Sequence, residues 1–390
     1  MKNILILLFF LTSCQSAQIE PNTTQEIPTK EPTSIEIPEI QPETESPIPQ
    51  TPELNIQNLQ TQTWIDSLDT PWGLTFLDEN TALVTQRNGI ILKISNWQTQ
   101  KEPYFQVSSN EIGEWWLMWI EKDPDFEENK YIYIMYTYSE NRVLKNKIVR
   151  LIDTGKTLTE DKIILDNIPW NRYHNGGRIK FWPDKKLYIT TWDASIPNNA
   201  QSFWNLAWKI LRVNNDGSIP EDNPFPNSRI FAYWLRNPQW IAFEPNSWDL
   251  FASSHGPTGE FGLMNRDRVL DFIIPGWNYG WPKVTWYSDT YQNPLIYSEN
   301  TSIPPAGMTF WHDKVFITTL KSEKIIVATL EKQNNTWKVL HQEDFLTKEY
   351  GRLRDAIVWP DNNLYILTSN KDGRWNEKYG SDKILKISLQ

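Results

Sequence analysis

The sequence predicts an all-β fold, a six-bladed β-propeller of four-stranded antiparallel blades. Three observations lead to this fold. A tight turn recurs six times along the chain, a run of β-branched and aromatic residues follows each turn, and a second such run comes before the next turn. The spacing of roughly 50–65 residues suits one four-stranded blade with its loops. A ring of blades leaves few exposed sheet edges, so we favour it over a β-sandwich with accidental internal similarity.

The six turns place two predicted strands in each repeat. The turn cores are 76–80, 123–127, 182–186, 244–248, 310–313 and 359–363. The strands predicted directly after them are TALVTQ (81–86), YIYIMYT (131–137), LYITTW (187–192), DLFASSH (249–255), KVFITTL (314–320) and NLYILTS (363–369). The next strands are GIILKIS (89–95), KIVRLI (147–152), KILRVN (209–214), RVLDFII (268–274), KIIVATL (324–330) and KILKISL (383–389). Asn, Asp, Gly and Pro bound these runs, as expected for strands joined by turns.

The first residues have the pattern of a processing signal. Lys2 precedes an apolar run, 4–11, that is too short to cross a bilayer. The sequence LTSC, which ends at Cys14, resembles a bacterial lipobox. Cys14 is the single cysteine, so the chain has no intrachain disulfide and an extracytoplasmic location is not contradicted. We predict a lipoprotein signal peptide over 1–14 and a lipid anchor at Cys14 that holds the chain on the cell envelope.

Residues 15–55 are predicted to be a disordered tether. They are rich in Pro, Glu and Thr, and they contain no aromatic residue. Such a segment cannot bury enough apolar surface to offset its ordering entropy. Residues 56–390 then form the propeller domain. The net charge of −10, without a dense Lys/Arg stripe, argues against nucleic acid as a partner.

His174 has the most suggestive surroundings of the four histidines. It lies in YHNGGR (173–178), where two glycines let backbone or ligand approach closely. The next predicted strand ends at Asp193, whose carboxylate would reach the imidazole and fix its tautomer. A histidine held in this way suits a general base. The residues alone leave a structural role for His174 equally open.

Several basic residues fall between predicted strands. Arg236 and Asn237 precede a proline that fixes the backbone. Lys321, Arg352 and Arg354 lie in later connections of the same kind. Each alone fits a solvated surface charge. Together they predict a cationic pocket in an acidic protein, suited to a ligand with several carboxylates.

Two turn-rich segments, 254–257 and 278–282, would expose backbone carbonyls. Such carbonyls suit a hard cation such as calcium, and Asp289 would add a carboxylate. By spacing alone, a pair of ordinary tight turns is the better explanation.

From about Leu68 to the C-terminus, the chain resembles the soluble pyrroloquinoline quinone (PQQ)-dependent sugar dehydrogenases, the glucose/sorbosone or aldose sugar dehydrogenase family. The shared motifs occur in order: LDTPWGL, DPDF, HNGGR, KILRVNNDGSIPEDNPF, LRNPQ, HGP, NYGWP, PPAGM, LKS and GRLRD. The resemblance implies PQQ- and calcium-dependent oxidation of aldose sugars at the anomeric carbon to lactones, with hydride passing to the quinone. The electron acceptor is not identified. A homodimer is compatible with the resemblance, because family members are often dimers.

The resemblance also implies a role for each candidate residue. His174 matches the general base, Asp193 the residue that orients it, and Arg236 a catalytic residue that stabilises charge on the quinone oxygen. The other matched cofactor contacts are Glu114, Asn237, Lys321, Arg352 and Arg354. The carbonyls of Gly256 and Pro257 match ligands of the calcium that polarises PQQ. Tyr279 and Asp289 match a second calcium site, which Val269 puts in doubt because the family has an acidic residue there.

The chain departs from the family in its tryptophans. It has 21 Trp and only 16 Gly, whereas glycine ordinarily makes up about 7% of a protein. Because some sites are turns, such as 246–249, where a positive φ is expected, a bulky residue there would be strained. We hypothesise that UGA codons read as glycine have been translated as tryptophan. The family pattern has glycine at Trp115, Trp116, Trp119, Trp182, Trp192, Trp208, Trp234, Trp240, Trp248, Trp277 and Trp359.

Three alternatives remain at this point. A degenerate propeller that has lost activity would also tolerate these tryptophans, because Trp115, Trp116, Trp192 and Trp234 would lie beside the matched site and block it. A non-catalytic propeller lipoprotein would bind glycan or protein partners, but binding alone would not need the retained basic set. A calcium-dependent propeller hydrolase or lactonase would need inward carboxylates on several blades, and no matching set is found. Trp72 and Trp281 match tryptophans of the family.

Overall fold

The computed structural model describes residues 54–107, 117–170, 177–192, 200, 202–233, 235–259, 262–285, 287–373 and 379–390. The chain separates into two compact units, Met1–Pro42 and Glu43–Gln390, and all described residues belong to the second. The predicted signal peptide and most of the predicted tether therefore lie outside the described residues. Within the described ranges, no helix has the length and apolar character needed to cross a membrane.

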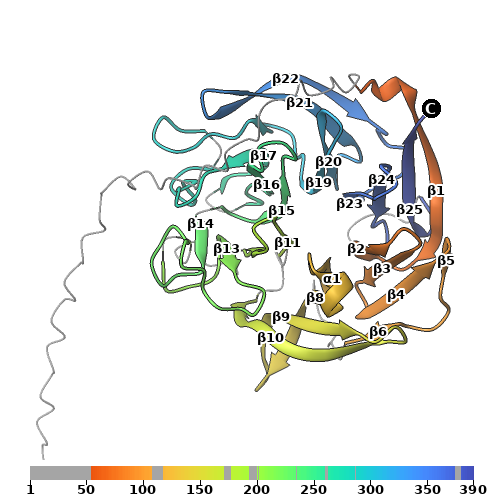
Figure 1. Ribbon diagram of the computed structural model, residues 1–390. Helices are drawn as coiled ribbons and strands as arrows, with labels where there is room; N and C mark the ends of the chain where they lie inside the picture. Colours follow the sequence, from red (N-terminus) through yellow and green to blue (C-terminus); the bar gives the residue numbers. More distant parts are fainter. Residues whose placement is uncertain are drawn as a thin grey trace, which may run out of the picture. The chain divides into compact units, whose positions relative to one another are not determined.

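Six antiparallel sheets are arranged in a ring, which confirms the predicted propeller (Figure 1). The first blade contains β2 (Pro71–Asp78), β3 (Thr81–Gln86), β4 (Ile90–Ser95) and β5 (Gln98–Thr99), and β6 (Phe105–Gln106) also pairs with β4. The second contains β7 (Leu117–Lys122), β8 (Tyr131–Glu140), β9 (Val143–Asp153) and β10 (Leu158–Pro169), and the third contains β11 (Ile179–Phe181), β12 (Leu187–Thr190), β13 (Lys209–Val213) and β14 (Ile230–Tyr233). The fourth contains β15 (Pro238–Phe243), β16 (Leu250–Ser254), β17 (Arg268–Ile273) and β18 (Ile296–Tyr297). The fifth blade contains β19 (Pro305–Trp311), β20 (Lys314–Thr319), β21 (Ile325–Gln333) and β22 (Thr336–Phe345). The sixth contains β23 (Leu353–Val358), β24 (Leu364–Thr368), β25 (Asp382–Leu389) and β1 (Leu59–Leu68).

The N-terminal strand closes the ring. β1 pairs antiparallel with β25, from Leu59 opposite Leu389 to Leu68 opposite Asp382. The single-turn 3₁₀ helix η1 (Ile56–Asn58) precedes β1, and Leu54 donates its backbone N–H to Asp313 Oδ1. Closure joins the first and last blades, so the last sheet gains its outer strand and the ring keeps no gap between its ends.

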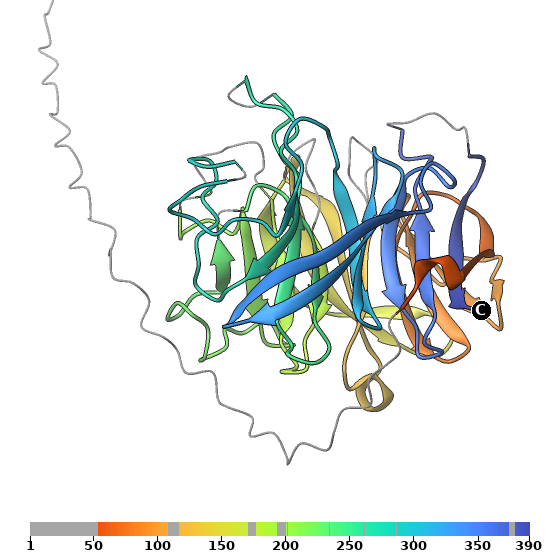
Figure 2. The same cartoon turned by 90° about the horizontal axis from the view of Figure 1, so that it is seen from above.

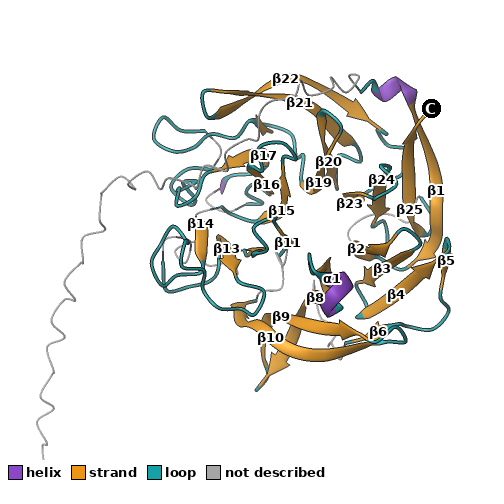
Figure 3. Cartoon of the chain, viewed as in Figure 1, coloured by secondary structure: helices purple, strands orange, loops and turns teal. Residues whose placement is uncertain are grey.

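Burial explains why the second strand of each blade was predictable. Every residue of β12, β16 and β20 is buried, and strands covered on both faces read as continuous apolar runs. The outer strand β22 instead alternates between exposed and half-buried residues. Regular structure in the described residues is almost all strand (Figure 3), and α1 (Phe126–Asn129) is a single helical turn.

The strands of each blade run between the two faces of the ring, as the side view shows (Figure 2). Because neighbouring strands are antiparallel, loops that join the second and third strands leave the blade on one face. The connections from a fourth strand to the next blade's first strand leave on that same face. We call it the top face.

Candidate active site

The described residues that were predicted at the cofactor lie in top-face connections or beside them. Arg236 and Asn237 lie between β14 and β15, Gly256 and Pro257 between β16 and β17, and Lys321 between β20 and β21. Arg352 directly precedes β23, and Arg354 is its second residue. The propeller topology thus brings residues that are far apart in sequence to one face.

An arginine cluster, Arg87, Arg352 and Arg354, lies where the last blade meets the first. Arg352 donates from Nε and Nη2 to Asp372 Oδ2, at 2.9 and 2.6 Å. Arg354 Nη2 donates to the same oxygen at 3.1 Å, and Arg87 Nη1 donates to the backbone carbonyl of Asp372 at 2.6 Å. Arg352 and Arg354 are 5% and 4% exposed. Two buried cations therefore share one carboxylate oxygen.

The electrostatics of the arginine cluster favour a further anion. Burial, with Arg352 and Arg87 close by, lowers the pKa of Arg354 to about 9, while Asp372 opposes this change. Burial, and then the charge of Arg352, also lower the pKa of Arg87, against the opposing effect of Asp372. The Arg354 guanidinium carbon lies 3.9 Å from the ring centroid of Trp72. These cations repel one another in a poorly solvated place, so an added anion would stabilise them.

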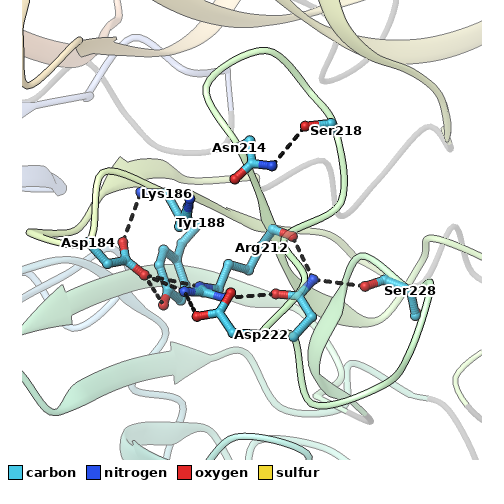
Figure 4. A network of polar contacts seen from close by, with 9 residues as sticks. Asp184, Lys186, Tyr188, Arg212, Asn214, Ser218, Asp222 and Ser228 are labelled. Atoms are coloured by element: carbon cyan, nitrogen blue, oxygen red, sulfur yellow. Dashed lines mark hydrogen bonds and ion pairs between the residues drawn. The ribbon is translucent and has the colours of Figure 1, made fainter. Parts of the chain in front are cut away.

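Arg212 shows how the same chain satisfies a structural arginine (Figure 4). Its guanidinium donates to two carboxylates, Asp184 and Asp222, with Nη2 at 2.7 and 2.8 Å from their Oδ2 atoms. Its Nη1 also donates to Asn223 Oδ1 at 3.0 Å. At Arg212, two carboxylates thus bind one guanidinium. At Asp372, one carboxylate binds the two guanidinium groups of Arg352 and Arg354. This contrast marks the arginine cluster as a place for an anionic ligand.

Arg236 and Asn237 are fixed by the loop that follows β16. Arg236 Nη1 donates to the carbonyl of His255 at 3.2 Å, and Nη2 to Thr258 Oγ1 at 3.3 Å. Asn237 donates its backbone N–H to Ser254 Oγ and accepts at Oδ1 from Gln239 Nε2, each at 3.0 Å. Both are buried, so the fold holds the two side chains in set orientations.

Gly256 lies in a tight crossing of two backbone segments. A Cβ there would lie 2.0 Å from the carbonyl oxygen of Asn265, so only glycine fits. The Gly256 N–H donates to Asp267 Oδ1 at 2.8 Å, and Asp267 Oδ2 accepts from the Ile303 N–H at 2.8 Å. Burial raises the pKa of Asp267, although these hydrogen bonds and Arg236 oppose the rise. Asp267 therefore fixes the loop that presents Pro257.

Tyr279 and Asp289 have different surroundings. The Tyr279 hydroxyl donates to the carbonyl of Phe272 at 2.8 Å and accepts from the Ile274 N–H at 2.9 Å. Tyr279 is 1% exposed, whereas Asp289 is exposed. In the part of the chain that the structure describes, no three His, Cys, Asp or Glu side chains group closely enough to hold a metal ion. A second calcium site built on Tyr279 and Asp289 stays a prediction.

A buried ion pair crosses the centre of the ring. Arg178, just before β11, lies with Nη1 3.4 Å from Oδ2 of Asp355 in β23. Its guanidinium carbon is 3.6 Å from the ring centroid of Trp240 and 4.9 Å from that of Trp119. Burial raises the pKa of Asp355 to about 6, against the opposing charge of Arg178. The first strands of several blades therefore meet around one cation.

The order of the motifs and this architecture agree with one family. Residues 68–377 match the family model described as Glucose / Sorbosone dehydrogenase.

The chain belongs to the glucose/sorbosone dehydrogenase family.

Several members of this family are similar over most of the chain. The aldose sugar dehydrogenase YliI of Escherichia coli is 29% identical over 360 residues, which cover 82% of this chain and 91% of that protein. A solved glucose dehydrogenase-type oxidoreductase from Thermus thermophilus is 33% identical, with a TM-score of 0.80 over 85% of this chain and 100% of that one. The PQQ-bound aldose sugar dehydrogenase of Streptomyces coelicolor is 30% identical, with a TM-score of 0.76 over 85% of this chain and 98% of that one.

Besides Tyr279 and Asp289, four family-matched residues have no described contact with the arginine cluster or with Arg236. Lys321 is exposed in its loop. Glu114, His174 and Asp193 lie outside the described residues. In sequence they fall between β6 and β7, β10 and β11, and β12 and β13, and their roles stay predictions.

Sequence reasoning missed Asp372, Arg87 and Asp267. Asp372 stands in NKDG (370–373), which reads as an ordinary turn. Arg87 follows a strand and has no neighbouring motif. Asp267 could have been suspected, because a carboxylate directly before the apolar run 268–274 must be satisfied once the strand is buried.

Proposed function

We propose that this glucose/sorbosone dehydrogenase family member oxidises aldose sugars to lactones with PQQ and calcium. The observation that carries the proposal is the sharing of Asp372 by Arg352 and Arg354, two buried cations on the top face. Relatives support it, because one solved structure is a PQQ-bound aldose sugar dehydrogenase. A quinoprotein glucose dehydrogenase B from Acinetobacter calcoaceticus is 32% identical over 267 residues.

The residues present fit a polycarboxylate cofactor. Arg352 and Arg354 would bind its carboxylates, with Lys321 in the neighbouring loop as a third cation. The carbonyls of Gly256 and Pro257 would contribute oxygen ligands to calcium. PQQ, when bound, supplies a quinone that accepts hydride.

The protein residues would handle the proton and the developing charge. His174 would take the proton from the anomeric hydroxyl of the sugar, and Asp193 would hold the His174 imidazole in the required tautomer. Arg236, whose guanidinium is fixed by His255 and Thr258, would stabilise negative charge as it develops on the acceptor.

A titration of the full chain with PQQ and calcium tests this function. Loss of one charge-assisted hydrogen bond of about 1.5–3 kcal/mol predicts that Arg354→Gln weakens PQQ binding about 10- to 100-fold. Arg150→Gln is the matched control, because Arg150 pairs with Asp161 away from the top-face connections. His174→Ala should abolish aldose-dependent dye reduction and leave PQQ binding intact. Equal PQQ affinity in the Arg354 and Arg150 variants would contradict the proposal.

A non-catalytic propeller is the second candidate. It is favoured by the buried tryptophans near the centre, since Trp119, Trp192 and Trp240 are each 1% exposed and fill space beside Arg178 or Gly177. Such a chain would bind glycan or protein partners without binding PQQ, so the same titration separates the two functions.

We also propose that the protein is attached to the cell envelope through Cys14. The lipobox-like sequence before Cys14 supports this attachment. Labelling of the expressed full chain with a fatty acid should give a labelled protein in the membrane fraction. Cys14→Ser should lose the label and leave that fraction, and an unlabelled wild-type chain would contradict the proposal.

A further inference from the structure

Three tryptophans adopt a backbone conformation that favours glycine. We call Trp97, Trp208 and Trp248 the turn tryptophans, and their φ angles are +67°, +69° and +59°. Asn and Asp tolerate this left-handed region better than other L-residues, and for a bulky side chain it is an outlier. No Phe or Tyr in the described residues has a positive φ, so three such tryptophans call for a common cause.

Trp97 occupies the second position of a two-residue hairpin loop. Ser95 pairs with Gln98 across β4 and β5, and Asn96 has a φ of +48°. A two-residue loop with both φ angles positive has the geometry of a type I′ turn, for which Asn-Gly is the preferred sequence. Asn96-Trp97 therefore has the expected first residue and lacks the expected second one.

Trp248 can be compared with two turns of related form in the same ring. In each, the last loop residue donates its N–H to the carbonyl of the residue that opens the turn, at 2.8 Å. This last residue is Lys185, Asn362 or Trp248, with φ of +57°, +57° and +59°. The loops lie between first and second strands, so the fold demands a left-handed residue there whatever the sequence supplies.

Four other tryptophans have a buried indole N–H that meets no acceptor in the described part of the chain. We call them the unpaired tryptophans: Trp119, Trp182, Trp192 and Trp359. Trp208 has the same defect. A buried polar group without a partner is costly. By contrast, Trp311 Nε1 donates to the carbonyl of Asn362 at 3.0 Å, and Trp337 Nε1 donates to Asp249 Oδ2 at 2.8 Å. Trp64 and Trp72 also lack an acceptor, so this feature alone does not decide.

Packing around Trp359 is too close. The ring centroids of Trp359 and Phe76 are 3.2 Å apart, whereas paired aromatic rings lie about 4.5–7 Å apart. This site holds more side chain than the space allows.

We propose that the natural protein carries glycine, inserted at UGA codons, at Trp97, Trp119, Trp182, Trp192, Trp208, Trp248 and Trp359. Glycine removes the strain of a positive φ, the unpaired indole N–H and the crowding at Phe76 in one change. Trp311 and Trp337 remain tryptophan, because their indoles are hydrogen-bonded. This inference does not rest on the proposed function, since it concerns the backbone and packing of the propeller.

Two measurements on the natural protein test the inference directly. Sequencing of the gene should find UGA at the codons for the turn tryptophans and UGG at those for Trp311 and Trp337. Peptide mass spectrometry of the protein from its own cells should find glycine at Trp97, Trp208 and Trp248, and tryptophan at Trp311. UGG codons or tryptophan-containing peptides at the turn sites would overturn the proposal.

Thermal unfolding of the full chain gives a separate readout. Trp97→Gly and Trp248→Gly, whose side chains are 48% and 42% exposed, should each raise the Tm, by about 1–2 °C for each kcal/mol of relieved strain. Trp248→Asn should also raise it, since Asn362 fills the related position. Trp311→Gly and Trp337→Gly are the controls and should lower the Tm. If the chain with every tryptophan does not fold, folding of the chain with the seven glycines supports the proposal. A fall in Tm at Trp97 and Trp248 equal to that of the controls contradicts it.

Discussion

Asp372→Asn is the sharpest test of the arginine cluster. The Asp372 carboxylate accepts three hydrogen bonds from Arg352 and Arg354, at 2.9, 2.6 and 3.1 Å. Its side chain is 3% exposed. Removing one partner of a buried ion pair costs about 3–5 kcal/mol, because the remaining charge stays buried without compensation. We therefore expect the free energy of unfolding to fall by about that amount.

The assay is urea unfolding of the full chain, followed by tryptophan fluorescence. Asp222→Asn is the matched control, because Arg212 keeps Asp184 and the Asp222 side chain is 67% exposed. Its loss should cost about 0–1 kcal/mol. A ligand with several carboxylates should restore more stability to the Asp372 variant than to the wild type, since it supplies the missing charge. Equal effects of the two substitutions, below about 1 kcal/mol, would refute the reasoning.

The remaining predictions concern three buried positions. Burial raises the pKa of Asp355 to about 6 from an ordinary value of 3.8, so the folded state holds its proton at a pH where the unfolded state has lost it. The contribution of Asp355 to stability is then fully present below about pH 4 and is lost as the pH rises to about 6. The difference in unfolding free energy between the wild type and Asp355→Asn should therefore change across this pH window. A difference that stays constant with pH would disprove the prediction. Tyr279→Phe removes a hydroxyl that serves both Phe272 and Ile274, so urea unfolding should show a loss of about 1–3 kcal/mol, whereas a change within experimental error would mean that both backbone groups find other partners. Gly256→Ala forces the loop apart at Asn265 and should lower both the Tm and the calcium-dependent activity, and an unchanged Tm would show that the crossing is not tight.

The most predictable strands are those that are buried on both faces. The predicted strand 81–86 coincides with β3, and the predicted 131–137 lies within β8. β1 was not predicted, because six of its ten residues are polar and only Ile65 and Leu68 are buried. The strand is defined by its pairing with β25, which lies more than three hundred residues away in sequence. A local pattern does not contain that information.

The candidate site was predictable to the extent that its residues carry motifs. Arg352 and Arg354 stand in GRLRD, and the structure brings them together on Asp372. Asp372 itself could not be found, because its importance comes from a contact across a loop. The positive φ expected at Trp248 is confirmed at +59°, since the short loop between two predicted strands fixes the backbone there whatever the side chain.

The pairing of β1 with β25 sets the order in which the protein can be completed during its synthesis. Among the described strands, β1 leaves the ribosome first, and its partner is β25, where Leu59 meets Leu389. Closing a loop of this length costs about 3 kcal/mol more chain entropy than closing a ten-residue loop, because the cost grows as (3/2)RT ln n. Before β1 and β25 pair, the first blade lacks a complete neighbouring blade on one side, and β25 lacks its outer partner strand. A nascent chain stalled before β25 would therefore hold an open ring with two unpaired strand edges, which are exposed to pairing with other chains.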